Sequence, residues 1–179
     1  RTTGGQQLES LTKITMRGLG DTHLSGFSFS NWRDYFDYLI TKLKIKKSTK
    51  PIILVFDEFP YLIEKNTGIS SFFQYGCDMG LKDLKVMIIL LGSSMSMMYK
   101  HTLDKKAPMY GRRTTQWLLE PFTYLESKDF YRGTSFKNSF PLYALTGGIP
   151  AYLKALDGSM SIEQNIRAKI LQEGNFLSI

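Results

Sequence analysis

Two short apolar runs stand out in the pattern of hydrophobic and polar positions along the chain. Residues 51–56 read PIILVF and residues 86–92 read VMIILLG, and each run ends abruptly in polar side chains. Continuous apolar runs of this length are typical of strands that are buried on both faces, as in parallel sheets covered by helices. A third, weaker strand is predicted at 115–120, TQWLLE, just before Pro121.

Helical spacing appears before and between these runs. Apolar residues recur every three or four positions from Asn31 to about Lys44, and a shorter helix is predicted over 69–79. Strands that alternate with helices predict βαβ connections, and hence an α/β fold with a three-layer, mostly parallel sheet. Residues 1–30 are rich in Gly, Ser and Thr and keep no regular period, so we predict a loop there with one short strand or helix.

The strand signal does not return after Pro121. Four helices are predicted there, at about 124–132, 139–146, 149–156 and 161–173. The last begins with a capping-box arrangement of Ser161 and Gln164. We therefore predict two domains, a sheet-containing core over 1–122 and a small helical subdomain over 123–179.

Composition narrows the class of protein. The chain has 179 residues, of which 42% are apolar, enough for a packed core. It contains no apolar stretch of about 18 residues and no leader pattern, so we predict a cytoplasmic protein without a membrane span. Its single cysteine, Cys77, excludes an internal disulfide, and with only two histidines beside it we expect metal to be held by oxygen ligands.

The net charge of +7 permits two interpretations. Much of the excess lies in a lysine run that starts near the end of the first predicted helix and continues to the first predicted strand: Lys42, Lys44, Lys46, Lys47 and Lys50. The run suits a solvated helix end, where the helix dipole favours positive charge. It also suits a nucleic-acid-binding patch.

The most informative polar residues follow the first apolar run. Asp57 and Glu58 come directly after it, and ligands of open parallel sheets bind beyond the carboxyl ends of the strands. A carboxylate at this position is a suitable ligand for Mg²⁺, which we expect Asp57 to hold through water. The second carboxylate, Glu58, could orient or deprotonate the water that attacks a γ-phosphate. The alternative is that the strand simply ends in acidic residues where it reaches solvent.

Ser93 and Ser94 end the second apolar run. A hydroxyl at the tip of a neighbouring strand can hydrogen-bond the attacking water or the γ-phosphate. A serine after a strand also serves as a helix cap or a turn residue. The spacing from Asp57, one helix and one strand later, favours the functional interpretation.

Five segments in this order carry a family resemblance: DEFPYLIE, FFQYGCD, ILLGSSMSMM, APMYGRR and YALTGGIPAYL. Together they resemble the archaeal-type ATPases of the AAA+ and STAND group of P-loop NTPases, over about residues 31–173. The resemblance implies a Walker B role for Asp57 and Glu58, with Mg²⁺ on Asp57. It also implies a sensor 1 role for Ser93 or Ser94.

The same resemblance extends to two later motifs. Arg112 and Arg113 match the basic pair that follows the sensor strand, and a guanidinium suits contact with phosphate, in this subunit or a neighbour. A surface ion pair or a loop anchor is the alternative for both. Gly148 and Pro150 match a GGxP element at the start of a helical lid, which would lie against the nucleotide. A plain helix–helix turn is the alternative there.

One motif of the family is absent. No GxxxxGK[ST] phosphate-binding loop occurs in the 179 residues, so the sheet is expected to lack the P-loop strand. We expect a truncated piece of a longer ATPase, one that binds ATP poorly and closes its sheet by self-association or by a rearranged strand.

Three functions follow from these patterns. The leading one is an ATP-binding and ATP-hydrolysing molecular switch with Mg²⁺, in which the lid responds to the nucleotide and a downstream effector domain contacts nucleic acid. The second is a basic nucleic-acid-binding module that uses residues 42–50. The third is a transcription or defence scaffold, a protein-interaction module without hydrolysis.

Overall fold

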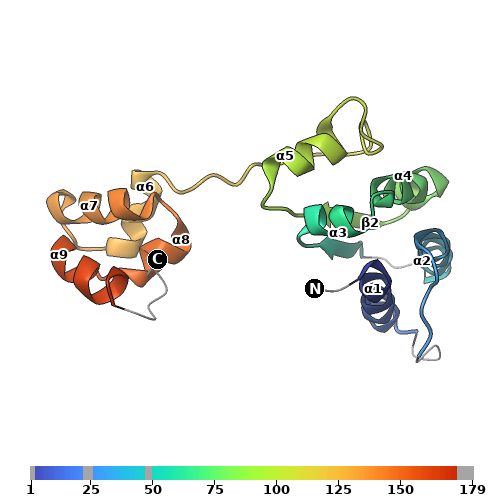
Figure 1. Ribbon diagram of the computed structural model, residues 1–179, viewed down its shortest axis with the longest axis horizontal. Helices are drawn as coiled ribbons and strands as arrows, with labels where there is room; N and C mark the ends of the chain where they lie inside the picture. Colours follow the sequence, from blue (N-terminus) through green and yellow to red (C-terminus); the bar gives the residue numbers. More distant parts are fainter. Residues whose placement is uncertain (1–2, 22–25, 47–49, 173–179) are drawn as a thin grey trace. The chain divides into compact units, whose positions relative to one another are not determined.

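The computed structural model describes residues 3–21, 26–46 and 50–172 (Figure 1). The chain divides into two compact units, Arg1–Thr115 and Gln116–Ile179. The first unit is α/β and holds a two-stranded parallel sheet, whereas the described part of the second is built from helices. Across these described ranges, no helix is both long and apolar enough to cross a membrane.

The first unit contains both strands. Its elements are α1 (Gly4–Leu19), α2 (Trp32–Lys46), β1 (Ile52–Phe56), α3 (Phe59–Lys65), α4 (Ile69–Met79), the 3₁₀ turn η2 (Leu81–Asp83), β2 (Val86–Leu90), α5 (Met95–Met98) and the π-helical turn η3 (Tyr99–Leu103). The predicted helices at 31–44 and 69–79 are confirmed as α2 and α4. The strands predicted at 51–56 and 86–92 are confirmed as β1 and β2.

Helix α1 corrects the interpretation of residues 1–30 as mostly loop. It spans 16 residues, begins with a capping box between Thr3 and Gln6, and ends at Gly20 in the left-handed conformation. Its buried face includes Thr12 and Thr15, whose hydroxyls bond the Leu8 carbonyl and the Tyr35 hydroxyl. Because two polar residues occupy buried helical positions, the hydrophobic period was hidden.

The two strands pair in parallel and in simple register. Ile52 lies opposite Val86, and Phe56 lies opposite Leu90. Parallel pairing places both carboxyl ends at one edge of the sheet, as the sequence predicted. The acidic pair after β1 and the serines after β2 therefore belong to the same edge.

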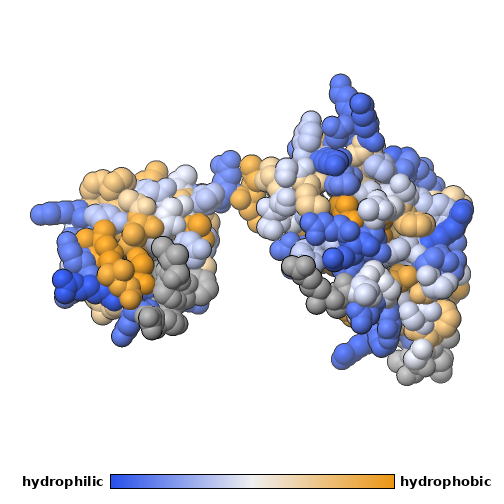
Figure 2. Space-filling view, viewed as in Figure 1, coloured by the Kyte–Doolittle hydropathy of each residue, from blue (hydrophilic) through white to orange (hydrophobic). Residues whose placement is uncertain are grey.

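The prediction that both faces of the strands are buried is wrong. One face packs on the core, but Ile53, Val55 and Met87 on the other face are 57%, 54% and 50% exposed. A strand is buried on both faces only where helices cover both. Large apolar side chains are also exposed elsewhere on both units (Figure 2).

The prediction of a third strand at 115–120 is also wrong. The structure shows no strand there, and Trp117 and Leu119 are 87% and 89% exposed. Within the described residues the sheet has two strands in the order β1–β2, so it has fewer strands than predicted. A strand needs a partner edge for its backbone groups, and the segment pairs with none in the described chain.

An aromatic core holds the first unit together. The ring of Phe73 on α4 meets those of Phe36, Phe56 and Phe59 edge to face, at centroid distances of 4.8 to 5.1 Å. Helix α2 packs against α4, where a Cβ on Gly76 would lie 2.6 Å from the Phe36 ring. This core lies beneath the end of β1 and the start of α3, and so supports the segment that carries the acidic pair.

The second unit follows the predicted helices. They are α6 (Tyr124–Ser127) with the 3₁₀ turn η4 (Lys128–Tyr131), α7 (Phe136–Thr146), α8 (Pro150–Ala155), and α9 (Ile162–Asn165) with the π-helical turn η5 (Ile166–Ile170). The capping box of Ser161 and Gln164 is confirmed. Leu142 and Leu153 form its core, where the Tyr131 hydroxyl donates to the Leu153 carbonyl at 2.9 Å.

Candidate functional site

Asp57 and Glu58 occupy the turn between β1 and α3. The Phe59 amide donates to the Leu91 carbonyl at 2.8 Å, and the Leu91 amide donates to the Phe56 carbonyl at 2.9 Å. These two bonds continue the β1–β2 pairing around the acidic pair. The turn is thereby fixed beside the end of β2 rather than left free in solvent.

The carboxylate of Asp57 is half engaged. Its Oδ1 accepts the Glu58 backbone N–H at 2.9 Å, and the side chain is exposed. The other oxygen has no partner among the residues that the structure describes. This donor set fits a hydrated Mg²⁺, because that ion commonly takes one or two carboxylate oxygens and keeps several waters.

Glu58 has an unusual backbone conformation. Its φ of 49° and ψ of 44° lie in the left-handed region, where it precedes the first turn of α3. Within the described chain it is the one residue other than glycine with positive φ. Such a conformation costs free energy and is concentrated at functional sites.

Ser93 lies against Glu58. Its Oγ donates to Glu58 Oε2 at 3.4 Å, a long hydrogen bond that connects the ends of the two strands. Gly92 makes this approach sterically feasible, because a Cβ there would lie 2.5 Å from Cδ of Pro60. The structure therefore brings Ser93, rather than Ser94, to the acidic pair.

Ser94 takes the position before α5. Its Oγ lies 3.5 Å from that of Ser96, at the outer limit of a hydrogen bond. Ser94 occupies the N-cap position of α5, but its side chain makes no capping hydrogen bond. Its part in nucleotide sensing stays a prediction.

An open pocket of about 610 Å³ adjoins this edge of the sheet. Its lining residues are Gln7, Asp57, Glu58, Tyr61, Leu62 and Ser93. Both charged groups of this lining are acidic. The pocket is therefore suited to a cation and a polarised water, whereas a triphosphate needs neutralisation from elsewhere.

Gln7 was missed by the sequence analysis. It comes from α1, which was interpreted as loop, and reaches the pocket because α1 packs on α3. The Thr3 and Gln6 capping box was a usable signal for the helix. No local pattern indicates that the seventh residue of the chain faces a strand end fifty residues later.

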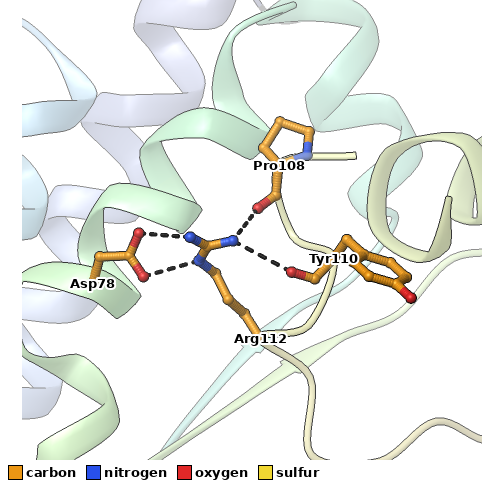
Figure 3. Close-up of polar contacts among 4 residues, drawn as sticks. All are labelled: Asp78, Pro108, Tyr110 and Arg112. Carbon is orange, nitrogen blue, oxygen red and sulfur yellow. Dashed lines mark hydrogen bonds and ion pairs between the residues drawn. The ribbon is translucent and has the colours of Figure 1, made fainter. Parts of the chain in front are cut away.

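Arg112 anchors the loop that follows η3 to helix α4. Its guanidinium binds Asp78 through two bonds of 2.9 and 2.7 Å, and Nη1 donates to the carbonyls of Pro108 and Tyr110 (Figure 3). The bidentate contact lowers the pKa of Asp78 and raises that of Arg112. This placement matches the loop-anchor alternative, and a phosphate contact by Arg112 stays a prediction.

Arg113 makes a weaker internal contact. Its Nη1 donates to the Thr102 carbonyl at 3.4 Å, and the residue is exposed. Neither arginine lines the pocket. Contact with the nucleotide of this subunit or a neighbour stays a prediction for Arg113 as well.

Gly148 and Pro150 belong to the second unit. Gly148 has a φ of +75°, a Cβ there would lie 2.1 Å from the Phe122 carbonyl oxygen, and its own carbonyl accepts the Phe122 amide at 2.9 Å. Pro150 lies in the first turn of α8. The motif thus builds a close backbone turn, and its contact with a nucleotide stays a prediction.

Part of the lysine run has internal partners. Lys42 pairs with Asp21 at 2.5 Å, and the Lys46 ammonium donates to the Leu19 carbonyl at 2.9 Å. Lys47 lies outside the described residues. These contacts connect α2 to the end of α1, which is a structural use of positive charge.

A family model described as an ATPase domain predominantly from Archaea matches residues 6–156. An uncharacterized protein of Methanocaldococcus jannaschii is 34% identical over 128 residues, which are 72% of this chain and 27% of that protein. A second uncharacterized protein of that organism is 41% identical over 61 residues, which are 34% of this chain and 55% of that protein. The chain thus spans from about a quarter to about half of these relatives' lengths.

Proposed function

The chain belongs to the family of ATPase domains found predominantly in Archaea, and from this premise we propose that it carries the magnesium- and water-binding edge of an ATP-hydrolysing molecular switch. The switch is of the AAA+ and STAND type, in which the nucleotide state moves a helical lid formed by residues 123–179. The protein is proposed to act in the cytoplasm.

One observation carries this proposal. Glu58, in a strained conformation after β1, accepts a hydrogen bond from Ser93 after β2, beside the exposed carboxylate of Asp57. An ordinary acidic strand end needs neither the strain nor the partner. The group of three resembles what the hydrolysis of a magnesium-bound triphosphate requires.

Each of the three residues has a separate role in the proposal. Asp57 holds Mg²⁺ through water, and the bound ion would neutralise charge on the terminal phosphates. Glu58 orients the attacking water and accepts its proton. Ser93 donates its one hydroxyl proton to the Glu58 carboxylate, and would redirect it to the water or the γ-phosphate when the nucleotide is bound.

The remaining motif residues have supporting roles in the proposal. Arg112 or Arg113 stabilises phosphate charge in this subunit or a neighbour. Gly148 and Pro150, before and at the start of α8, are proposed to bring the lid's backbone toward the nucleotide. Arg112 would have to exchange its bonds to Asp78 for phosphate, which makes Arg113 the favoured member of the pair.

The 179 residues contain no GxxxxGK[ST] loop, and the pocket's charged side chains are both acidic. We therefore propose that these residues alone bind ATP weakly, because no P-loop backbone and lysine neutralise the phosphates. Calorimetric titration with ATP and Mg²⁺ checks this. Micromolar affinity would contradict it.

The decisive variant is Glu58→Gln in the full-length protein. It keeps the shape of the side chain but removes the proton acceptor, so kcat should fall by about a hundredfold or more while ATP affinity changes little. Steady-state ATPase assays and nucleotide titration measure the two quantities. Glu64→Gln, on the exposed side of α3, is the matched control and should retain activity. Wild-type turnover in Glu58→Gln would refute the assignment.

A nucleic-acid-binding module is the second candidate, and the charge distribution favours it. The whole net charge of +7 arises from residues 1–115. Binding to DNA through this charge should weaken steeply with salt and be lost in a Lys46→Glu, Lys47→Glu variant. A filter-binding or anisotropy titration at several salt concentrations distinguishes this candidate from the ATPase. No DNA binding at low salt would exclude it.

A further inference from the structure

The pocket beside the acidic pair contains one neutral amide, that of Gln7. We propose that the Gln7 amide nitrogen donates a hydrogen bond to the terminal phosphate of bound ATP, held in that orientation by Asn66 and Trp32. This inference rests on the proposed ATPase function. It adds to that function a residue by which the site distinguishes ATP from ADP.

Two hydrogen bonds in series set the orientation. Trp32 Nε1 donates to Asn66 Oδ1 at 3.2 Å, and Asn66 Nδ2 donates to Gln7 Oε1 at 2.9 Å. An indole N–H can only donate. Asn66 must therefore present its oxygen to Trp32 and its NH₂ to Gln7, which in turn must present its oxygen to Asn66.

The surroundings make this arrangement rigid. Trp32 is 6% exposed, and Asn66 Nδ2 also donates to the Leu62 carbonyl at 3.1 Å. Gly4 permits the close approach of α1, because a Cβ there would lie 2.6 Å from Asn66 Oδ1. The amide of Gln7 therefore has one orientation, set through Asn66 by the buried Trp32 indole and the Leu62 carbonyl.

The consequence is a free donor in the pocket. Gln7 Nε2 has no hydrogen-bond partner in the described part of the chain, and the side chain lines the pocket with Asp57 and Glu58. This N–H could be accepted by a carboxylate of the pocket, Asp57 or Glu58, or by a phosphate oxygen of a bound nucleotide. In the proposed function Glu58 faces the water at the γ-phosphate, so a donor in the same pocket meets that phosphate rather than the others.

A structural alternative exists for the same contacts, since they also connect α1 to the end of α3. The two roles use different atoms of Gln7. The connection uses Oε1, whereas recognition of phosphate uses Nε2. Gln7→Glu separates the two roles. The new carboxylate can still accept the Asn66 N–H, but it has no N–H to donate and its negative charge repels phosphate.

The experiment measures the affinities of the full-length protein for ATP and ADP, each with Mg²⁺, by titration with fluorescent nucleotides. Gln7→Glu should weaken ATP binding by about tenfold or more, since a hydrogen bond to a charged group is lost. ADP binding should change by less than about twofold. Ser10→Ala, an exposed position on α1, is the control and should bind both like wild type.

A second variant tests the orienting role of Trp32. Trp32→Phe keeps an aromatic ring in the core but removes the N–H that binds Asn66 Oδ1. Among the described residues, the Leu62 carbonyl is then the one remaining group that orients the Asn66 amide, so the orientation of Gln7 is less strongly fixed. The variant should lower the preference for ATP over ADP, and it should have no further effect in a Gln7→Ala background. A full additional effect there would contradict the series of hydrogen bonds.

The outcomes separate this inference from the ATPase proposal. If the wild-type protein binds no ATP, both the proposed function and this inference are wrong. If the protein hydrolyses ATP and Gln7→Glu keeps the wild-type preference for ATP, the inference alone is overturned. An equal loss of ATP and ADP affinity, or a lowered melting temperature with an unchanged preference, would show that Gln7 only connects α1 to α3.

Discussion

At the scale of single residues, the backbone of Glu58 is the feature that most separates this strand end from an ordinary one. Its φ of 49° is a conformation that Asn adopts more readily than Glu. The structure nevertheless has Glu there, and its carboxylate meets Ser93. Strain at this position is consistent with selection for the carboxylate rather than for stability.

This strain can be measured. Glu58→Asn should raise the free energy of unfolding by about 0.5 to 1 kcal/mol, because Asn tolerates the left-handed region, and should abolish ATP turnover. Urea unfolding followed by circular dichroism gives the first quantity. A variant that is clearly less stable than wild type would show that the Glu58 contacts outweigh the strain.

Some of the site residues could be predicted from the sequence and others could not. Asp57, Glu58 and Ser93 follow apolar runs, so their meeting could be predicted once the strands were taken as parallel neighbours. Gln7 could not, because its position depends on how α1 packs. The Arg112 motif was visible, yet its bonds to Asp78 depend on the meeting of two distant segments.

At the scale of elements, the close contact between the segments after β1 and β2 positions the site. Gly92 has no side chain where Pro60 and Met98 lie nearest, at 2.5 and 3.0 Å from a Cβ built there. The absence of a side chain brings Ser93 to Glu58. The same principle governs Gly76, where α4 meets Phe36 of α2.

Gly92→Ala tests this contact. The added methyl group should force Pro60 and the segment before Ser93 apart, with a loss of about 1 to 3 kcal/mol in unfolding free energy and a fall in ATP turnover. Gly5→Ala is the control, since a Cβ there meets nothing within 4 Å and lies in a helix. That control should be neutral or slightly stabilising. Equal behaviour of the two variants would contradict the steric account.

The elements also show which sequence signals were decisive. Continuous apolar runs located β1 and β2, but the run at 115–120 formed no strand because strand formation depends on a partner edge outside the segment. Helix α1 was missed because Thr12 and Thr15 fill buried positions with satisfied hydroxyls. Both errors arise from tertiary contacts that overrule local pattern.

At the scale of the whole molecule, the sheet is small for the amount of apolar surface it presents. Ile53, Val55 and Met87 lie exposed on one face, and the described sheet ends at β1 and β2. Exposed apolar strands with unpaired edges favour association. We therefore predict that the 179-residue chain self-associates in solution.

Light scattering coupled to size exclusion checks this prediction. The apparent mass should exceed 20.5 kDa and rise with concentration. Val55→Lys, which places a charge on the exposed face, should reduce the association. A monomer at every concentration would contradict the prediction, and the exposed face would then be compatible with solution on its own.

The central claim is that the carboxyl ends of β1 and β2 hold a magnesium-bound nucleotide, and the most direct measurement locates the metal. Mn²⁺ replaces Mg²⁺ at oxygen-ligand sites and broadens nearby NMR signals. In full-length Glu58→Gln, which should retain uncleaved ATP, Mn²⁺ is predicted to broaden the amide signals of residues 57–59, 61 and 91–94, and Asp57→Asn should abolish the effect. Broadening centred elsewhere, or unchanged by Asp57→Asn, would contradict the claim.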